Sequence, residues 1–171
     1  MKCGICICGL NGSGKTTLAG ALAKELNFKH MDVEHYYFIS ADIPYSSPKT
    51  REEVEWLLLE DIKQNPCFVF SAVNGNMTEE INEYYNIVIY LDVPWDIRMK
   101  RIRQRAIDKF GERVLPGGDM YEQEEAFFAY AEKRSPDKIE NWLKTLQCKV
   151  VRLDGTKPIH ENVQIIKDSL V

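Results

Sequence analysis

The sequence lacks the features that would place the chain in a membrane, on nucleic acid or in the secretory pathway. No apolar run approaches the ~20 residues that a membrane-spanning helix requires. The apolar start of the chain runs into a glycine-rich stretch without a small-residue cleavage site, so no signal peptide is expected. A net charge of −4 is unlike the basic character of most nucleic-acid-binding domains. We therefore expect no membrane and no nucleic acid as a partner.

Cysteine and histidine are too few and too scattered to indicate a disulfide framework or a metal centre. The five cysteines are an odd number, and the three histidines show no metal-ligand spacing. Cys3, Cys6 and Cys8 lie within one apolar run, where free cysteine packs as a small hydrophobe. A metal or redox site built from these three is the weaker interpretation. The expected location is the cytoplasm, where thiols stay reduced.

The sequence does contain an alternation of short β-type runs and longer amphipathic stretches. This pattern is typical of a parallel sheet with helices on both faces. We expect one domain over residues 1–171, without an internal repeat. Strands are expected at 3–8, 28–31, 67–72, 86–91 and 148–153, with helices between them and after 158. Two polar segments, 40–49 and 109–119, are expected to be loops, the second of them mobile.

The strongest signal is the segment from Gly9 to Thr16, which fits G-x-x-x-x-G-K-[ST] at every fixed position. Its glycines let the backbone curl so that N–H groups point at phosphate, and the helix that follows adds the positive end of its dipole. Lys15 is expected to reach the β- and γ-phosphates, and the Thr16 hydroxyl to bind Mg²⁺. A plain glycine turn is the alternative, but the flanking strand and helix favour a nucleotide site. The expected nucleotide contacts are Gly9, Asn11, Gly12, Ser13, Gly14, Lys15, Thr16 and Thr17.

A second signal is a cluster of arginines after the fourth expected strand. Arg98, Arg101 and Arg105 share one side of a helix, next to an apolar face. Guanidinium groups bind phosphate in a fork and stack on planar bases. A solvated basic face is the alternative, because charged helix faces usually contact only water. The apolar face consists of Met99, Ile102 and Ala106.

With these motifs the chain resembles the nucleoside monophosphate kinase group of P-loop kinases, adenylate kinase most plainly, and its shikimate and gluconate kinase relatives. The resemblance is specific at the P-loop, at 91–94 with Arg101 and Arg105, and at 154–158. It implies a three-layer α/β/α P-loop NTPase fold with a five-stranded parallel sheet in the order 2-3-1-4-5. It also implies a helical lid at about 106–135, with ATP and Mg²⁺ as cofactors. We expect a monomer or a homodimer.

The resemblance also implies roles for residues outside the P-loop. Arg101 would stack on the adenine of ATP, and Arg105 would contact its transferring phosphates. Gly155 and Lys157 would line the adenine pocket through their backbone, and Arg113 in the lid would close over the γ-phosphate. Asp92, which ends the fourth expected strand, is interpreted as a helix cap and not as a metal ligand.

The acceptor side departs from the monophosphate kinase pattern. The segment 71–76 lacks the arginine that binds the acceptor's phosphate in those enzymes, which favours a neutral acceptor such as a nucleoside, a sugar or another hydroxyl compound, shikimate-like included. Asp32 occupies the position of the acidic residue near the acceptor hydroxyl in the shikimate- and gluconate-type relatives. A turn cap is the alternative for Asp32, and Glu34 is the second candidate. Further candidates for the acceptor pocket are His35, Tyr36, Tyr37, Arg51 and Asn74.

The expected function is transfer of the γ-phosphate of ATP to a hydroxyl of a small molecule. The expected catalytic residues are Lys15, Asp32, Arg105 and Arg113. Two alternatives stay open. The first is a nucleoside monophosphate kinase that uses an arginine from elsewhere, such as Arg51. The second is a regulatory nucleotide-dependent ATPase whose output is the state of a partner protein.

Overall fold

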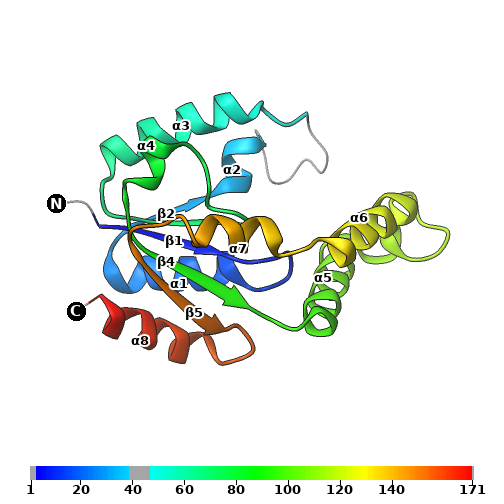
Figure 1. Cartoon of the computed structure of the whole chain (residues 1–171). Helices are drawn as coiled ribbons and strands as arrows, with labels where there is room; N and C mark the ends of the chain where they lie inside the picture. The colour runs from blue at the N-terminus through cyan, green and yellow to red at the C-terminus, as the bar shows by residue number, and fades with distance from the viewer. Residues whose placement is uncertain (1–2, 39–46, 171) are drawn as a thin grey trace.

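Five parallel strands form the centre of the molecule (Figure 1). The computed structural model describes residues 3–38 and 47–170, so most of the loop predicted at 40–49 lies outside the described residues. The sheet has the order β2-β3-β1-β4-β5, as predicted, and every neighbouring pair is parallel. The strands are β1 (Gly4–Cys8), β2 (Lys29–Asp32), β3 (Phe68–Ala72), β4 (Tyr85–Asp92) and β5 (Lys149–Asp154).

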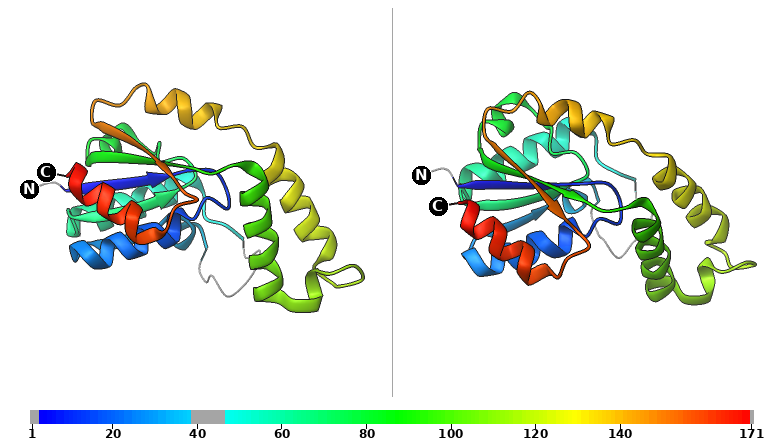
Figure 2. Two further views of the ribbon diagram at one scale, coloured as in Figure 1. Left: turned by 90° about the horizontal axis from the view of Figure 1, so that it is seen from below. Right: turned by 60° about the horizontal axis from the view of Figure 1, so that its bottom comes forward.

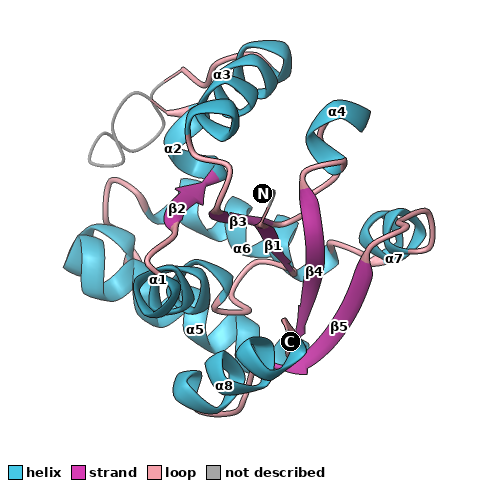
Figure 3. Ribbon diagram, turned by 90° about the vertical axis from the view of Figure 1, so that its left-hand side faces the viewer, coloured by secondary structure: helices cyan, strands magenta, loops and turns pink. Residues whose placement is uncertain are grey.

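Helices cover both faces of the sheet (Figures 1 and 3). α1 (Lys15–Leu26) and α8 (Ile159–Ser169) pack on one face, and α3 (Arg51–Gln64), α4 (Glu79–Asn82) and α7 (Asp137–Leu143) pack on the other. Neighbouring residues of a strand point to opposite faces. The central strand β1 is therefore apolar throughout, with Ile5 and Ile7 in one core and Cys6 and Cys8 in the other.

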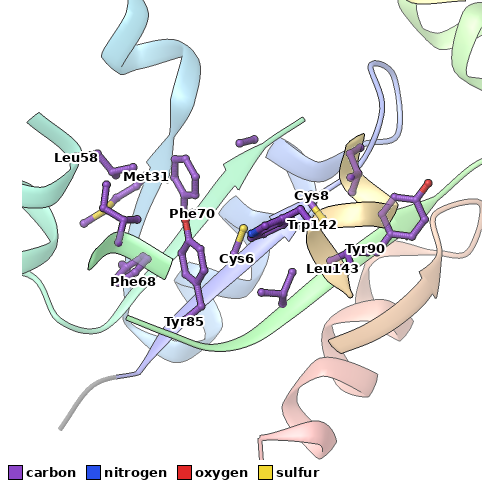
Figure 4. Close-up of a cluster of buried hydrophobic side chains, with 14 of the residues drawn as sticks. Cys6, Cys8, Met31, Leu58, Phe68, Phe70, Tyr85, Tyr90, Trp142 and Leu143 are labelled. Atoms are coloured by element: carbon purple, nitrogen blue, oxygen red, sulfur yellow. The ribbon is translucent and has the colours of Figure 1, made fainter. Parts of the chain in front are cut away.

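Aromatic side chains fill the core beneath α3 and α7 (Figure 4). The rings of Phe70 and Tyr85 are nearly parallel with centroids 6.5 Å apart, and Tyr85 meets Trp142 of α7 edge-on at 6.3 Å. The Tyr85 hydroxyl donates a hydrogen bond of 3.0 Å to the carbonyl of Gly75. This bond fixes the backbone just after β3, at the edge of the sheet where the strands end.

α5 (Trp95–Phe110) and α6 (Tyr121–Lys133) project beyond the carboxyl ends of the strands (Figure 2). They pack on each other through a small apolar cluster that contains Met99, Ile102 and Ala106, the apolar face predicted for this helix. The segment predicted as a loop at 109–119 contains the end of α5 and a 3-10 turn, η1 (Gly111–Val114).

Two short helices are absent from the sequence prediction, α2 (Val33–Tyr37) and α4. Each has fewer residues than the periodicity of a helix needs to become visible. Side chains start both: Asp32 accepts a hydrogen bond from the N–H of Glu34, and Thr78 accepts one from the N–H of Ile81.

The cysteines divide between core packing and one disulfide. Cys6 and Cys8 are free and buried, as predicted. Cys3 forms a disulfide with Cys67, so the prediction of reduced thiols is wrong for this pair. The two residues precede the adjacent strands β1 and β3, and their Cα atoms are 4.6 Å apart, a separation that a disulfide can bridge. In the described part of the chain, no helix is long and apolar enough to cross a bilayer.

Gly75 offers a direct test of this packing. A Cβ there would lie 2.3 Å from the Cys6 sulfur and 2.6 Å from the Trp142 ring, both of which are buried. We expect Gly75→Ala to lower the free energy of unfolding by about 1–3 kcal/mol, measured by urea titration, because the core must shift to admit the methyl group. Gly20→Ala in α1 is the matched control, since its Cβ would meet only His30 at 3.7 Å. The control should be neutral or more stable by up to about 1 kcal/mol, and equal effects of the two changes would contradict the packing argument.

Candidate functional site

The loop between β1 and α1 has the geometry of a phosphate cradle. Gly12 and Gly14 adopt positive φ angles of 80° and 91°, a region that favours glycine. Gly14 occupies the N-cap position of α1, and no side chain within the described residues caps this helix end. The first N–H groups of α1 are therefore available to an anion, with the helix dipole adding positive potential.

Two arginines of α5 donate hydrogen bonds to the backbone of the cradle. Arg98 is 5% exposed and donates to the carbonyls of Asn11, at 3.1 Å, and Val93, at 3.1 Å. Arg101 donates to the carbonyls of Ser13, at 3.3 Å, and Gly155, at 3.1 Å. Both side chains thus bind backbone of the cradle, and the alternative of a basic face that contacts only water does not apply to them.

Lys15 lies at the centre of a mixed group of charges. Burial lowers the pKa of its ammonium to about 8, while the carboxylates of Glu34 and Asp32 act in the opposite direction. Arg105 and Arg134 lower this pKa further. The fold therefore brings Lys15 together with two predicted carboxylates and with arginines from two separate segments.

A small cleft of about 220 Å³ opens on the α8 side of the cradle. Arg101 and the turn after β5 border it, as the resemblance implied for an adenine pocket. The lining residues are Ser13, Gly14, Thr17, Leu18, Leu91, Arg101, Gly155, Lys157, Ile159 and Asn162. This volume is below the range of roughly 300–1,000 Å³ for sites that enclose a drug-sized ligand, and it suits one part of a ligand that continues along the cradle.

A larger cleft of about 950 Å³ opens on the opposite side of the cradle, between α2, α3 and α7. Arg51 at the start of α3, Arg134 before α7 and Lys138 in α7 bring positive charge to it, and Glu79 brings one negative charge. Tyr37 and several asparagines add hydrogen-bonding groups. The asparagines are Asn74, Asn76, Asn82 and Asn141.

Comparisons with known proteins agree with this geometry. A family model described as an AAA domain matches residues 5–144. The chain belongs to this family. A protein of Bacillus subtilis (strain 168) named uncharacterized protein YqaC is 31% identical over 99% of this chain and 98% of its own length. The family assignment rests on residues 5–144, and the similarity to this relative extends over nearly the full chain.

Two further relatives are kinases. A cytidylate kinase of Streptococcus pyogenes is 29% identical, over 68% of this chain and 56% of its own length. A shikimate kinase of Psychrobacter cryohalolentis is 35% identical, over 53% of this chain and 54% of its own length. The chain therefore spans about half the length of each of these kinases.

Two solved structures share the fold. A shikimate kinase from Bacteroides thetaiotaomicron has a TM-score of 0.62 and 21% identity, with 98% of each chain covered. A sugar kinase from Janibacter sp. has a TM-score of 0.56 and 18% identity, covering 99% of this chain and 95% of its own. At these identities the likeness concerns the fold alone.

Several residues predicted for the site line the larger cleft or lie near Lys15. Tyr37, Arg51 and Asn74 line the larger cleft. Asp32 is 6% exposed and combines both of its predicted roles in position, since it caps α2 and lies within the electrostatic range of Lys15. Arg105 acts on the same group of charges, and it also lines a third cavity of about 310 Å³ together with Glu34.

Other predicted residues have different partners. The Tyr36 hydroxyl donates a hydrogen bond of 2.5 Å to Asp61 of α3, so this hydroxyl already has a partner within the protein. Arg113 is exposed and pairs with Asp119 through Nε at 3.0 Å and Nη2 at 2.8 Å. Both partners lie in the turn between α5 and α6, so the role of Arg113 over the γ-phosphate stays a prediction. His35 is exposed and lines neither of the two clefts.

Sequence reasoning missed Arg134. Its Nη1 donates to the Asn11 side chain at 3.2 Å, and its guanidinium lies over the ring of Tyr130. It therefore contacts the cradle and lines the larger cleft at once. No local pattern marks this residue, because its role depends on where the segment between α6 and α7 passes the P-loop.

The residues around Lys15 also fit a Mg²⁺ ion that arrives with a nucleotide. Mg²⁺ prefers oxygen ligands and is usually held by one or two carboxylates together with substrate phosphates and water. The Thr16 hydroxyl belongs to the first turn of α1, and the Asp32 carboxylate acts on Lys15 electrostatically, so both are oxygen donors of the kind that Mg²⁺ prefers. Among the described residues, no group of three or more His, Cys, Asp or Glu side chains could hold a metal ion without the nucleotide.

The bracing of the cradle can be tested at Arg98. Replacement by methionine keeps much of the volume but leaves the carbonyls of Asn11 and Val93 without this donor. We expect Arg98→Met to weaken binding of a nucleoside triphosphate about tenfold or more, because a cradle without this donor, which contributes about 1–3 kcal/mol, must be ordered by the nucleotide itself. Calorimetric titration measures the change. Arg103→Met is the matched control on the same helix, since Arg103 pairs with Glu125 of α6 at 2.8 Å; an equal loss in this control would overturn the interpretation.

The charge group around Lys15 predicts a dependence of binding on pH. Bound phosphates favour the ammonium, so a site whose lysine has a pKa of about 8 must take up protons when a triphosphate binds near that pH. Affinity should therefore fall as pH rises above 8. Calorimetry at pH 8.5 in two buffers of different ionisation enthalpy measures the uptake, and Lys15→Arg, which stays charged, should abolish it. Absence of uptake by the wild-type protein would contradict the prediction.

Proposed function

We propose that the protein transfers the γ-phosphate of ATP to a hydroxyl group of a small, polyhydroxylated acceptor that also carries an anionic group. The observation that carries this proposal is the larger cleft, which Arg134 connects to Asn11 of the cradle and which combines Arg51, Arg134 and Lys138 with four asparagines. Asparagine side chains both donate and accept hydrogen bonds, which suits hydroxyl groups. The arginines suit a carboxylate or a phosphate.

The acceptor in this proposal differs from the neutral one that the sequence favours. The segment after β3 has no arginine, but Arg51 comes from the start of α3 and Arg134 from the segment before α7. Positive charge therefore reaches the cleft from other elements. The shikimate kinase among the relatives supports a hydroxylated, acidic acceptor, and the sugar kinase of similar fold is compatible with it.

The donor side of the proposal rests on the cradle and on the smaller cleft. Lys15 and the N–H groups at the start of α1 would hold the β- and γ-phosphates, with Arg105 close by. Arg101 and Gly155 border the cleft that would take the base. Mg²⁺, held by Thr16 and Asp32, would neutralise phosphate charge when bound.

One of the two carboxylates beside Lys15 would serve the acceptor hydroxyl. Phosphoryl transfer demands mainly positioning and charge neutralisation, so one carboxylate suffices to orient the hydroxyl and accept its proton. Glu34 is exposed and is the larger of the two carboxylate influences on Lys15. Asp32 is buried and engaged by the N–H of Glu34. We assign Asp32 to the cation side and Glu34 to the hydroxyl.

A nucleoside monophosphate kinase is the second candidate. The cytidylate kinase relative favours it, and so does the presence of Arg51 and Arg134, which could bind the acceptor's phosphate. A screen of sugars, sugar phosphates, hydroxy acids such as shikimate, nucleosides and nucleoside monophosphates for acceptor-stimulated ADP release separates the candidates. Turnover that responds to a protein partner and to none of these compounds would instead favour a regulatory ATPase.

Variants of the larger cleft provide the sharper test once an acceptor is found. We expect Arg134→Met to raise the KM for an anionic acceptor about tenfold or more, because charge-assisted hydrogen bonds contribute about 1.5–3 kcal/mol. Lys133→Met, at the neighbouring exposed position, is the matched control and should change the KM little. Glu34→Gln should lower kcat about 100-fold or more. Full activity of both Arg134→Met and Glu34→Gln would remove the proposed acceptor site.

A further inference from the structure

The smaller cleft contains a buried amide that neither the P-loop nor the charge group explains. Asn162 lies in the first turn of α8, is 2% exposed and lines the cleft. It interrupts an apolar stripe, because Ile159, Val163 and Ile166 share its side of the helix. A polar side chain at such a position is expensive unless its hydrogen bonds are made.

Only one end of this amide has a partner. The Nδ2 group donates to the carbonyl of Asp154 at 2.9 Å, which fixes the orientation of the amide, since that carbonyl can only accept. The Oδ1 atom is buried and has no hydrogen-bond partner among the residues that the structure describes. Asn162 therefore lines the cleft and carries a buried acceptor without a partner.

The other unpaired buried atoms also belong to residues that line one of the two clefts. Four buried side-chain atoms lack a hydrogen-bond partner within the described ranges 3–38 and 47–170. Two belong to Ser13 and Asn162 in the smaller cleft, and two belong to Asn82 and Trp142 in the larger one. Buried polar groups in proteins are otherwise almost always paired. Because these unpaired atoms belong to residues that line the two clefts, bound ligands are the expected source of their hydrogen-bond partners.

We propose that Asn162 determines the base specificity of the donor nucleotide, with its Oδ1 accepting a hydrogen bond from the 6-amino group of adenine. This inference rests on the proposed function, in which ATP is the phosphoryl donor and its base enters the smaller cleft. A purine with a 6-oxo group places a second acceptor against Oδ1, and a purine with hydrogen at that position leaves Oδ1 unpaired. Both should bind less tightly than adenine.

Three triphosphates that differ at position 6 of the purine test the proposal. These are ATP, purine riboside 5′-triphosphate, which lacks the amino group, and inosine 5′-triphosphate, which carries the oxo group. We expect the wild-type protein to bind ATP about three- to tenfold more tightly than purine riboside triphosphate, the worth of one hydrogen bond. Inosine triphosphate should bind more weakly still. Calorimetric dissociation constants measure both ratios.

Asn162→Leu removes the acceptor at nearly constant size and should bring the ratio of ATP to purine riboside triphosphate close to one. A merely structural Asn162 would weaken all three ligands alike and leave the ratio unchanged. Thr156→Val is the matched control, because it disturbs the same turn by removing the hydroxyl that donates to Asp154 at 2.6 Å. The control should keep the wild-type ratio.

The outcomes separate this inference from the proposed function. Equal affinities of the wild-type protein for ATP and purine riboside triphosphate would overturn the role of Asn162 and leave ATP as a donor. Failure of the wild-type protein to bind any of the three would overturn the proposed function itself. Because this comparison needs no variant, it decides the matter even where Asn162→Leu does not fold.

Discussion

The close approach of α5 to the phosphate loop is the contact on which the rest of the site depends. A Cβ on Gly12 would lie 2.6 Å from the carbonyl oxygen of Arg98 and 2.9 Å from the Ile102 side chain. Only glycine allows the loop and the helix to meet at this distance. Because of this contact, Arg98 donates a hydrogen bond to the carbonyl of Asn11, and Arg101 donates one to the carbonyl of Gly155. The cradle is therefore shaped by the packing of a helix that begins more than 80 residues later in the chain.

This packing gathers positive charge in a protein whose net charge is −4. Arg105 and Arg134 approach Lys15 from separate segments, and burial of the lysine lowers its pKa to about 8. Without a ligand the arginines repel the ammonium, and the carboxylates of Glu34 and Asp32 act against this repulsion. A triphosphate supplies the missing negative charge, so the same arrangement that is unfavourable in the empty site favours binding of the nucleotide.

The parts of the molecule that the sequence predicts are those fixed by local spacing. The glycines and Lys15 act within one loop, so the sequence motif predicts the cradle. The strands are visible as short apolar runs, and their order follows from the family resemblance. Arg134 could not be found in this way, since its bond to Asn11 joins residues 123 positions apart. The Cys3–Cys67 disulfide likewise depends on the pairing of β1 with β3. Asn162 is visible in the sequence as a polar residue within an apolar stripe. Its hydrogen bond to Asp154, however, can be seen only in the folded chain.

The two clefts share a further property that ties stability to function. A buried polar atom without a partner lowers the stability of a fold, and natural proteins contain few of them. Within the described residues, such atoms occur in pairs, one pair in each cleft. Packing alone would have favoured apolar side chains at these positions, as it does at Val163 and Leu143 beside them. The unpaired atoms of the described residues thus belong to residues on the donor side and on the acceptor side alike, where the proposed ligands would bind.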